Sequence, residues 1–205
     1  MIKQGLISLF VAMLLGVIVV EIAHAKEPTV EYFTNIPADV ISLTHGFANG
    51  IGLIPDNVKD LTNSPISNML GLIVRIRDKD GNLVGLANEL EAFPDDKGFR
   101  PEISWKTDWT IRTAHGSLYM YQTEQVPAAH FPAFEAVAEG KDWSGSLPAQ
   151  VTTGPHSTRR GIVVGGTGVY QGVSGTFVES VELQGLTTAG KISGILSLQI
   201  YLDPK

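Results

Sequence analysis

The sequence predicts an all-β fold, an antiparallel eight-stranded β-barrel. Segments in which apolar and polar residues alternate recur about eight times along the chain, which is the period of a strand with one buried face. Short segments rich in Gly, Asp and Pro join them, and no long stretch has helical periodicity. Regular short strands are typical of sandwiches and closed barrels, and an eight-stranded barrel holds one small ligand or is filled by side chains.

Composition excludes several functions. The chain has 205 residues with 43% hydrophobic content, enough for one domain with a substantial core. A net charge of -6, with 15 basic residues and no basic block, argues against nucleic-acid binding. The absence of cysteine excludes thiol nucleophiles, disulfides and cysteine-based zinc sites.

The first 25 residues have the pattern of a secretory signal peptide. A basic start at Lys3 precedes the uncharged apolar run 6–20, and Ala23-His24-Ala25 gives the small-x-small cleavage pattern. We expect cleavage after Ala25 and a secreted or periplasmic protein; the alternative is an uncleaved membrane anchor. Residues 26–68 are expected to form an extension with an edge strand at 30–33, and residues 69–205 the barrel domain.

Residues 69–93 predict a β-hairpin. Leu70 and Leu72 begin an alternating run that reaches Ile76, and Asp78-Lys79-Asp80-Gly81 supplies the turn. Calcium binding by an EF-hand is not expected there, because a glutamate at the twelfth loop position and flanking helices are missing.

The middle of the chain predicts a second hairpin and then a loop. Residues 103–111 alternate most clearly, and 113–116, which include His115, turn the chain into strand 117–124. Residues 126–139 are expected to form a loop with one helical turn, long enough to cover a barrel mouth. A further strand is expected at 144–152 and a final one at 192–202.

Residues 161–183 read as a strand, a tight glycine corner and a second strand. A nucleotide-binding loop would need a helix after the glycines, whereas 176–183 has the period of a strand. Glycine tolerates φ > 0 and close approach of another backbone, as a barrel corner requires. The structural glycines of this corner are Gly165, Gly166, Gly168, Gly172 and Gly175.

The segment VVGGTGVYQGVSG, 163–175, resembles the signature shared by plant dirigent proteins and allene oxide cyclases. The hairpin segment RDKDGNLVG, 77–85, is similar to bacterial members of the allene oxide cyclase barrel group. The resemblance covers roughly 69–202. It implies a calycin-like antiparallel barrel, commonly a homotrimer, with no metal or organic cofactor and with a hydrophobic or phenolic small molecule as ligand.

The resemblance also points to individual residues. Plant cyclases use a Glu, Asn residues and a Ser-Pro pair that hold water in an apolar pocket. Ser64-Pro65 is present here with Asp56 as the carboxylate considered before it, and Asn88 in LANEL is a candidate for one of the asparagines.

Strand parity gives candidate catalytic residues from the sequence itself. Glu179 is in register with Phe177 and Val181, and Asn88 with Leu86 and Leu90. If these faces point inward, a carboxylate and an amide enter an apolar barrel, where burial raises the pKa of a carboxyl group and suits it to acid–base catalysis. The alternatives are a solvated Glu179 at the barrel mouth and a hydrogen-bonded Asn88 at a strand end.

Aromatic residues give candidate ligand contacts. Tyr119, Tyr121 and Phe177 would suit a planar or unsaturated ligand if they line the barrel. The two tyrosines alternate with Leu118 and Met120, so either set lines the interior, and outward-facing tyrosines would suit a subunit interface.

The sequence therefore predicts an exported barrel without a cofactor that binds a hydrophobic small molecule and steers its cyclisation or coupling, as an isomerase or a dirigent-like protein does. A binding or carrier protein without chemistry is the first alternative, and a barrel filled by its own side chains is the second.

Overall fold

A computed structural model describes residues 27–45, 69–93 and 104–204. The leader, Asp56 and Ser64-Pro65 lie outside these ranges. The strands are β1 (Val30–Ile36), β2 (Val40–His45), β3 (Met69–Arg77), β4 (Leu83–Ala92), β5 (Ser104–Thr113), β6 (Gly116–Gln125), β7 (Trp143–Gln150), β8 (Thr152–Gly154), β9 (Gly161–Gly166), β10 (Gly175–Leu186) and β11 (Ile192–Leu202).

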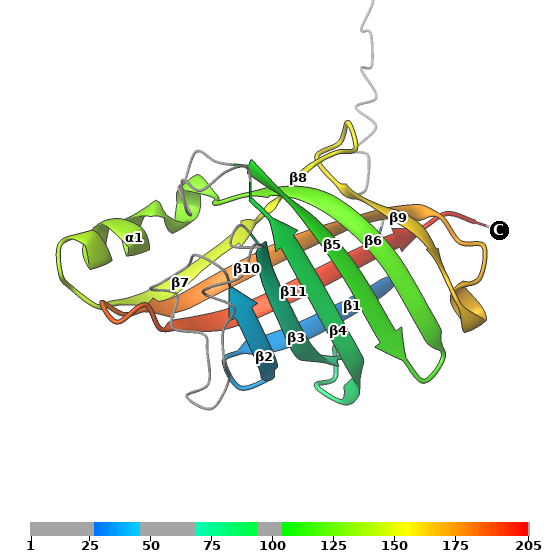
Figure 1. Ribbon diagram of the computed structural model, residues 1–205, viewed down its shortest axis with the longest axis horizontal. Coiled ribbons are helices and arrows are strands. Elements are labelled where there is room, and N and C mark those ends of the chain that lie inside the picture. Colours follow the sequence, from blue (N-terminus) through cyan, green and yellow to red (C-terminus); the bar gives the residue numbers. More distant parts are fainter. Residues whose placement is uncertain (1–26, 46–68, 94–103, 205) are drawn as a thin grey trace, which may run out of the picture.

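Eight of these strands form a closed antiparallel barrel, which confirms the predicted fold class (Figure 1). The order around the barrel is β1-β11-β10-β9-β6-β5-β4-β3, and a contact between Phe33 of β1 and Arg77 of β3 closes it. The segment predicted as an edge strand is β1. That prediction is wrong, because β1 pairs along its whole length with β11 and also reaches β3.

The three other strands lie outside this circle. β2 pairs with β3, β7 with the far half of β10, and β8 with the end of β6. The chain leaves the barrel after β6 and forms a 3₁₀ turn, η1 (Ala128–His130), and helix α1 (Phe131–Ala138) before β7. The predicted single helical turn is thus a two-turn helix, whose buried Ala133 packs on Leu183 and Leu186 of β10.

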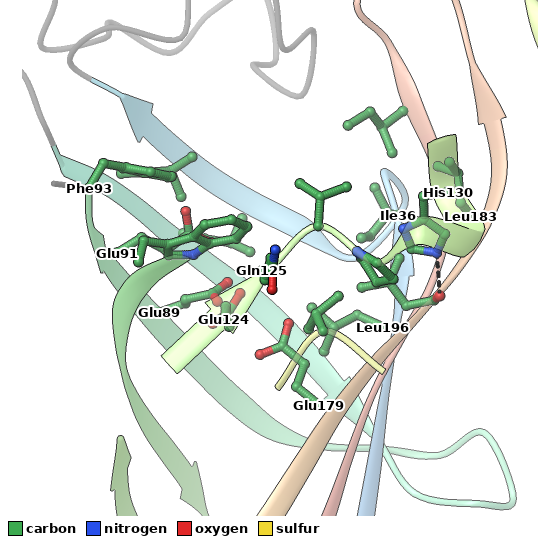
Figure 2. Close-up of a pocket in the computed structure, with 18 of the residues that line it drawn as sticks. Ile36, Glu89, Glu91, Phe93, Glu124, Gln125, His130, Glu179, Leu183 and Leu196 are labelled. Atoms are coloured by element: carbon green, nitrogen blue, oxygen red, sulfur yellow. Dashed lines mark hydrogen bonds between the residues drawn. The ribbon is translucent and has the colours of Figure 1, made fainter. Parts of the chain in front are cut away.

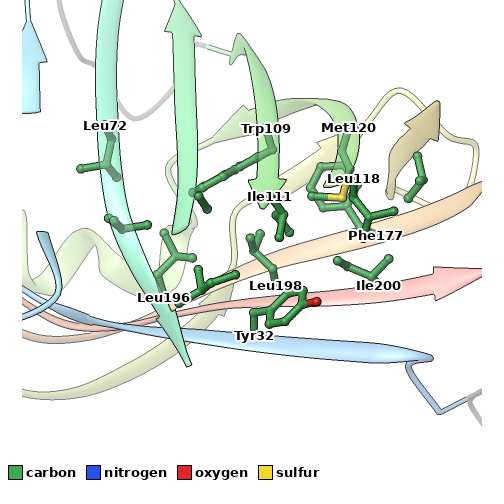
Figure 3. Close-up of a cluster of buried hydrophobic side chains, with 14 of the residues drawn as sticks. Tyr32, Leu72, Trp109, Ile111, Leu118, Met120, Phe177, Leu196, Leu198 and Ile200 are labelled. Atoms are coloured by element: carbon green, nitrogen blue, oxygen red, sulfur yellow. The ribbon is translucent and has the colours of Figure 1, made fainter. Parts of the chain in front are cut away.

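The apolar core extends through the barrel to Phe131 and Phe134 of α1, and it fills the half that holds the glycine corner. Inward side chains of facing strands meet there, including Trp109, Ile111 and Leu118 from β5 and β6 and Leu198 and Ile200 from β11 (Figure 3). All five are 0–1% exposed, so this half of the barrel is packed with side chains.

The glycine corner connects β9 to β10 through a second 3₁₀ turn, η2 (Gly168–Tyr170). Gly168 has φ +61°, and a Cβ there would lie 2.2 Å from the backbone oxygen of His115 in the β5–β6 turn. The corner therefore packs directly on the neighbouring hairpin, which only glycine permits. In the described part of the chain, no helix has the length and apolar character needed to cross a membrane.

Candidate functional site

A cavity of about 180 Å³ lies inside the barrel, bordered by the segment that follows β6. Its walls are mostly apolar and include Ile36, Leu72, Phe93 and Leu196 (Figure 2). Its polar lining residues are four glutamates, one glutamine and one histidine: Glu89, Glu91, Glu124, Glu179, Gln125 and His130.

The four glutamates come from three strands that the barrel brings together. Glu89 and Glu91 lie on the inner face of β4, two residues apart, as the period of a strand requires. Glu124 ends the inner face of β6, and Glu179 lies on β10. Glu89, Glu124 and Glu179 are each 3% exposed, so three long acidic side chains are buried in one apolar chamber.

β9 lies between β6 and β10, but it pairs only with residues 118–121 of β6 and 175–177 of β10. Glu179 lies past these paired residues, so its side chain can reach β6. The short strand β8 bridges the opening: the Thr152 hydroxyl accepts a hydrogen bond from the Glu179 backbone N–H at 2.7 Å. The same hydroxyl donates to Oε1 of Gln122 at 2.6 Å. β8 thus positions both the Glu179 backbone and the Gln122 amide.

One carboxylate oxygen of Glu179 receives both of its side-chain hydrogen bonds. Trp109 Nε1 donates to Oε2 at 2.9 Å, and the Gln122 amide donates to the same atom. Gln122 also donates to Oε1 of Glu124 at 2.6 Å, so one amide bridges two carboxyl groups. Within the described residues, Oε1 of Glu179 receives no hydrogen bond, which leaves it available to a ligand.

Burial dominates the electrostatics of the cluster. Removal from water raises the pKa of Glu179 well above its usual value, and the neighbouring Glu124 raises it further. Burial also raises the pKa of Glu89 and of Glu91. Burial raises the pKa of Glu124 to about 7, the rise being limited by hydrogen bonds from other side chains, Gln122 among them. A group with the pKa of Glu124 exchanges protons near neutral pH, as acid–base catalysis needs.

His130 lies at the opposite side of the cavity from the glutamates (Figure 2). It ends the turn η1 and is 5% exposed. Its Nε2 lies 2.9 Å from the Leu147 carbonyl oxygen and 3.2 Å from that of Val181. Because carbonyl oxygens only accept, Nε2 carries the hydrogen. Nδ1 makes no hydrogen bond to any residue in the described ranges.

The structure places the predicted site residues in different regions. Glu179 lies in the cavity, as its parity predicted. Asn88 does not: its face of β4, shared with the exposed Leu86 and Leu90, points outward. The inner face carries the two glutamates instead. Both faces of β4 hold apolar residues, so the parity rule alone selected the wrong one.

The predicted aromatic ligand contacts are also wrong. Tyr119 and Tyr121 are 38% and 40% exposed on the outer face of β6, while Leu118 and Met120 point inward. Phe177 is fully buried in the core, where its ring lies against Gly161, and it does not border the cavity. The aromatic residues that do border the cavity include Phe93 and Trp105, whose ring centroids are 5.3 Å apart.

Sequence reasoning missed four functional candidates, Glu89, Glu91, Glu124 and His130. The pair Glu89-x-Glu91 carries a strand-period signal, since Ala87 and Phe93 continue the same face on either side. Nothing in the sequence distinguishes His130 from an exposed loop histidine.

Comparisons with known proteins give a distant structural likeness. No family model matches the chain, and no curated protein matches it. Among solved structures, a pyocyanin demethylase is similar with a TM-score of 0.39 and 15% sequence identity, over 83% of this chain and 99% of that one. The function is therefore argued from the site itself.

Proposed function

We propose that this barrel binds a hydrophobic small molecule in its cavity and steers the rearrangement of that molecule by proton transfer, as an isomerase or cyclase. The observation that carries the proposal is the buried carboxyl group of Glu179. Trp109 and Gln122 hold it through one oxygen, and the other oxygen is left for a ligand. The apolar walls supply binding free energy by removing ligand surface from water.

The chemistry needs no co-reactant. The protonated carboxyl group of Glu179 donates its proton to a basic atom of the bound molecule, such as a carbonyl or ether oxygen. A second proton leaves a carbon atom and passes to Nδ1 of His130, or to Glu179 once it is ionised. Because one proton is added and one removed, the product is an isomer of the substrate. The rigid walls favour one conformer and so one ring geometry.

The resemblance to allene oxide cyclases and dirigent proteins supports this reaction class. It rests on the sequences of the glycine corner and of the β3–β4 hairpin. In the structure the first is two strands joined through the turn η2, and the second is two strands joined by a turn at Gly81. A carrier protein without chemistry is the second candidate, and the mostly apolar cavity lining favours it.

The proposal extends to export and assembly. A leader removed after Ala25 predicts a mature protein that starts at Lys26, which the intact mass of the secreted chain tests. An outer apolar surface, defined here as the exposed side chains of β3, β4 and β6, fits a subunit interface of a homo-oligomer such as a trimer. These side chains are Ile73, Leu86, Leu90, Tyr119 and Tyr121.

The experiment has two stages. Native mass spectrometry of the protein purified from its source, followed by extraction, identifies the bound molecule. That molecule and its isomers are then incubated with wild-type protein, with Glu179→Gln and with Glu182→Gln. Glu182 lies on the same strand but does not line the cavity; its carboxylate accepts a hydrogen bond from Ser146, and it serves as the matched control.

We expect wild type and Glu182→Gln to interconvert isomers of equal mass, resolved by chromatography, and Glu179→Gln to bind the molecule without converting it. A molecule recovered unchanged after incubation with wild-type protein would establish the carrier function instead. Full turnover by Glu179→Gln would contradict the role of this carboxyl group.

A further inference from the structure

Three carboxyl groups meet at one point of the inner barrel wall. Carboxylate oxygens of Glu89, Glu91 and Glu124 all lie within 4.8 Å of one another. β5 separates the two strands that carry them, and its Thr107 pairs with Glu91 on one side and with Gln122 on the other. The short side chain of Thr107 leaves room above β5 for the longer glutamates to converge.

The cluster has an unsatisfied acceptor that points to a ligand. Oε1 of Glu89 is buried and accepts no hydrogen bond from an N–H or O–H group of the described residues, although buried acceptors are nearly always paired. The Glu89 carboxyl group interacts instead with the carboxyl group of Glu91, a second acid. Glu89 is only 3% exposed, so its side chain is almost fully buried, and it borders the cavity. None of the ion pairs within the described part of the chain involves the three glutamates.

We propose that Glu89, Glu91 and Glu124 bind a divalent cation, with Ca²⁺ as the best fit. The three residues offer only carboxylate oxygens, which hard cations prefer over softer transition metals. Calcium–oxygen distances of about 2.3–2.6 Å place opposite ligands up to about 5 Å apart, whereas Mg²⁺ holds them within about 4.2 Å. The three oxygens lie within 4.8 Å of one another, which Ca²⁺ can span, and a set of three carboxylates in an apolar cavity suits Ca²⁺ better than Mg²⁺, which keeps several waters.

A cation at this point completes the coordination of the buried oxygen and offsets the repulsion among the carboxylates. It also lies at the polar end of the cavity, beside the place proposed for the ligand. The inference does not depend on the proposed isomerase function, because Glu179 is not one of the three ligands, although the Gln122 amide donates to both Glu179 and Glu124.

Terbium luminescence tests the site directly. The indole of Trp105 lies against Glu91 and Glu124, so excitation of tryptophan will sensitise Tb³⁺ bound there. Full-length protein is stripped with a chelator, titrated with Tb³⁺, and then titrated with Ca²⁺ to displace it. The variants are Glu89→Gln and Glu91→Gln, which keep the side-chain volume, and Glu182→Gln is the control outside the cavity.

We expect wild type and Glu182→Gln to bind one Tb³⁺ per chain and to release it to Ca²⁺. Each cavity variant is expected to lose affinity by about tenfold or more. Calcium is also expected to raise the thermal unfolding midpoint of wild type, a readout that needs no variant to fold.

The absence of sensitised emission together with an unchanged unfolding midpoint would overturn the proposal and show that protons alone satisfy the carboxyl groups. Emission that persists undiminished in both cavity variants would also overturn it, since the ion would then be bound elsewhere. Binding of Tb³⁺ without displacement by Ca²⁺ would exclude calcium as the ligand of this cluster.

Discussion

An ion pair beside the contact that closes the barrel, between Asp39 and Arg77, gives a quantitative prediction. Asp39, in the turn after β1, accepts hydrogen bonds from Arg77 of β3, at 2.8 Å from NH2 to Oδ1 and 2.9 Å from Nε to Oδ2. The Asn35 backbone and side chain also donate to Oδ2. The Asp39 side chain is 1% exposed, so this ion pair is shielded from water on one side. The perturbation is Asp39→Asn.

The magnitude follows from the pKa of Asp39. The hydrogen bonds from Arg77, and after them those from Asn35, lower this pKa from 3.8 to about 2. A fall of this size corresponds to about 2 kcal/mol of stability at neutral pH. Because the folded-state pKa is the lower one, this stability is present above pH 3.8 and is lost as the pH falls through about 2. Asp39→Asn should therefore destabilise the protein by about 2 kcal/mol or more at pH 7.

Urea unfolding followed by the fluorescence of the buried Trp109 measures this difference. We expect the difference in the free energy of unfolding between wild type and Asp39→Asn to be largest at pH 7 and to decrease as the pH falls below 4. The matched control is Asp80→Asn in the β3–β4 turn, an exposed site whose ion pair with Lys79 is 3.6 Å long and should contribute under about 0.5 kcal/mol. A gap below about 0.5 kcal/mol, or one independent of pH, would refute the reasoning.

Three further predictions concern the site and the surface. Thr152→Val leaves the buried backbone N–H of Glu179 without its acceptor, so the free energy of unfolding should fall by about 1–3 kcal/mol and turnover should decrease. An unchanged free energy of unfolding would contradict this. Gly168→Ala places a Cβ against the carbonyl oxygen of His115, whereas Gly140→Ala, also at positive φ, places it in open space. The midpoint of thermal unfolding should therefore fall further for Gly168→Ala than for Gly140→Ala. Leu90→Ser on the outer apolar surface should shift the mass measured by light scattering toward the monomer, and a wild type that is already monomeric would exclude the interface.

Strand positions were predictable because alternation is a local property. The hairpin from Met69 to Ala92, its turn at Gly81 and the glycine corner after β9 all follow from residues that are close in sequence. The face that points inward was predictable only where one face is clearly apolar, as in β11. In β4, where leucines alternate with glutamates, it was not.

The misreading of β4 has a physical cause. The assignment of strand faces from alternating residues assumes that the buried face is apolar and the solvent face polar. Here the interior at this level is a cavity that accepts carboxyl groups bridged by an amide, and the exterior carries exposed leucines and tyrosines. The usual pattern is thus reversed at β4, the strand that contributes two of the cavity's four glutamates.

The sequence by itself determined most of the strands after residue 69, their turns, the barrel class and the candidate Glu179, because each depends on short-range pattern. It did not determine β2 or the division of 144–152 into β7 and β8. Only the tertiary structure decided which carboxyl groups meet. Glu89, Glu124 and Glu179 are far apart in sequence, and their assembly depends on the barrel closing through β1 and β3 and on β8 bridging β6 to β10. Such long-range registers are set by the packing of the whole barrel, which no local pattern encodes.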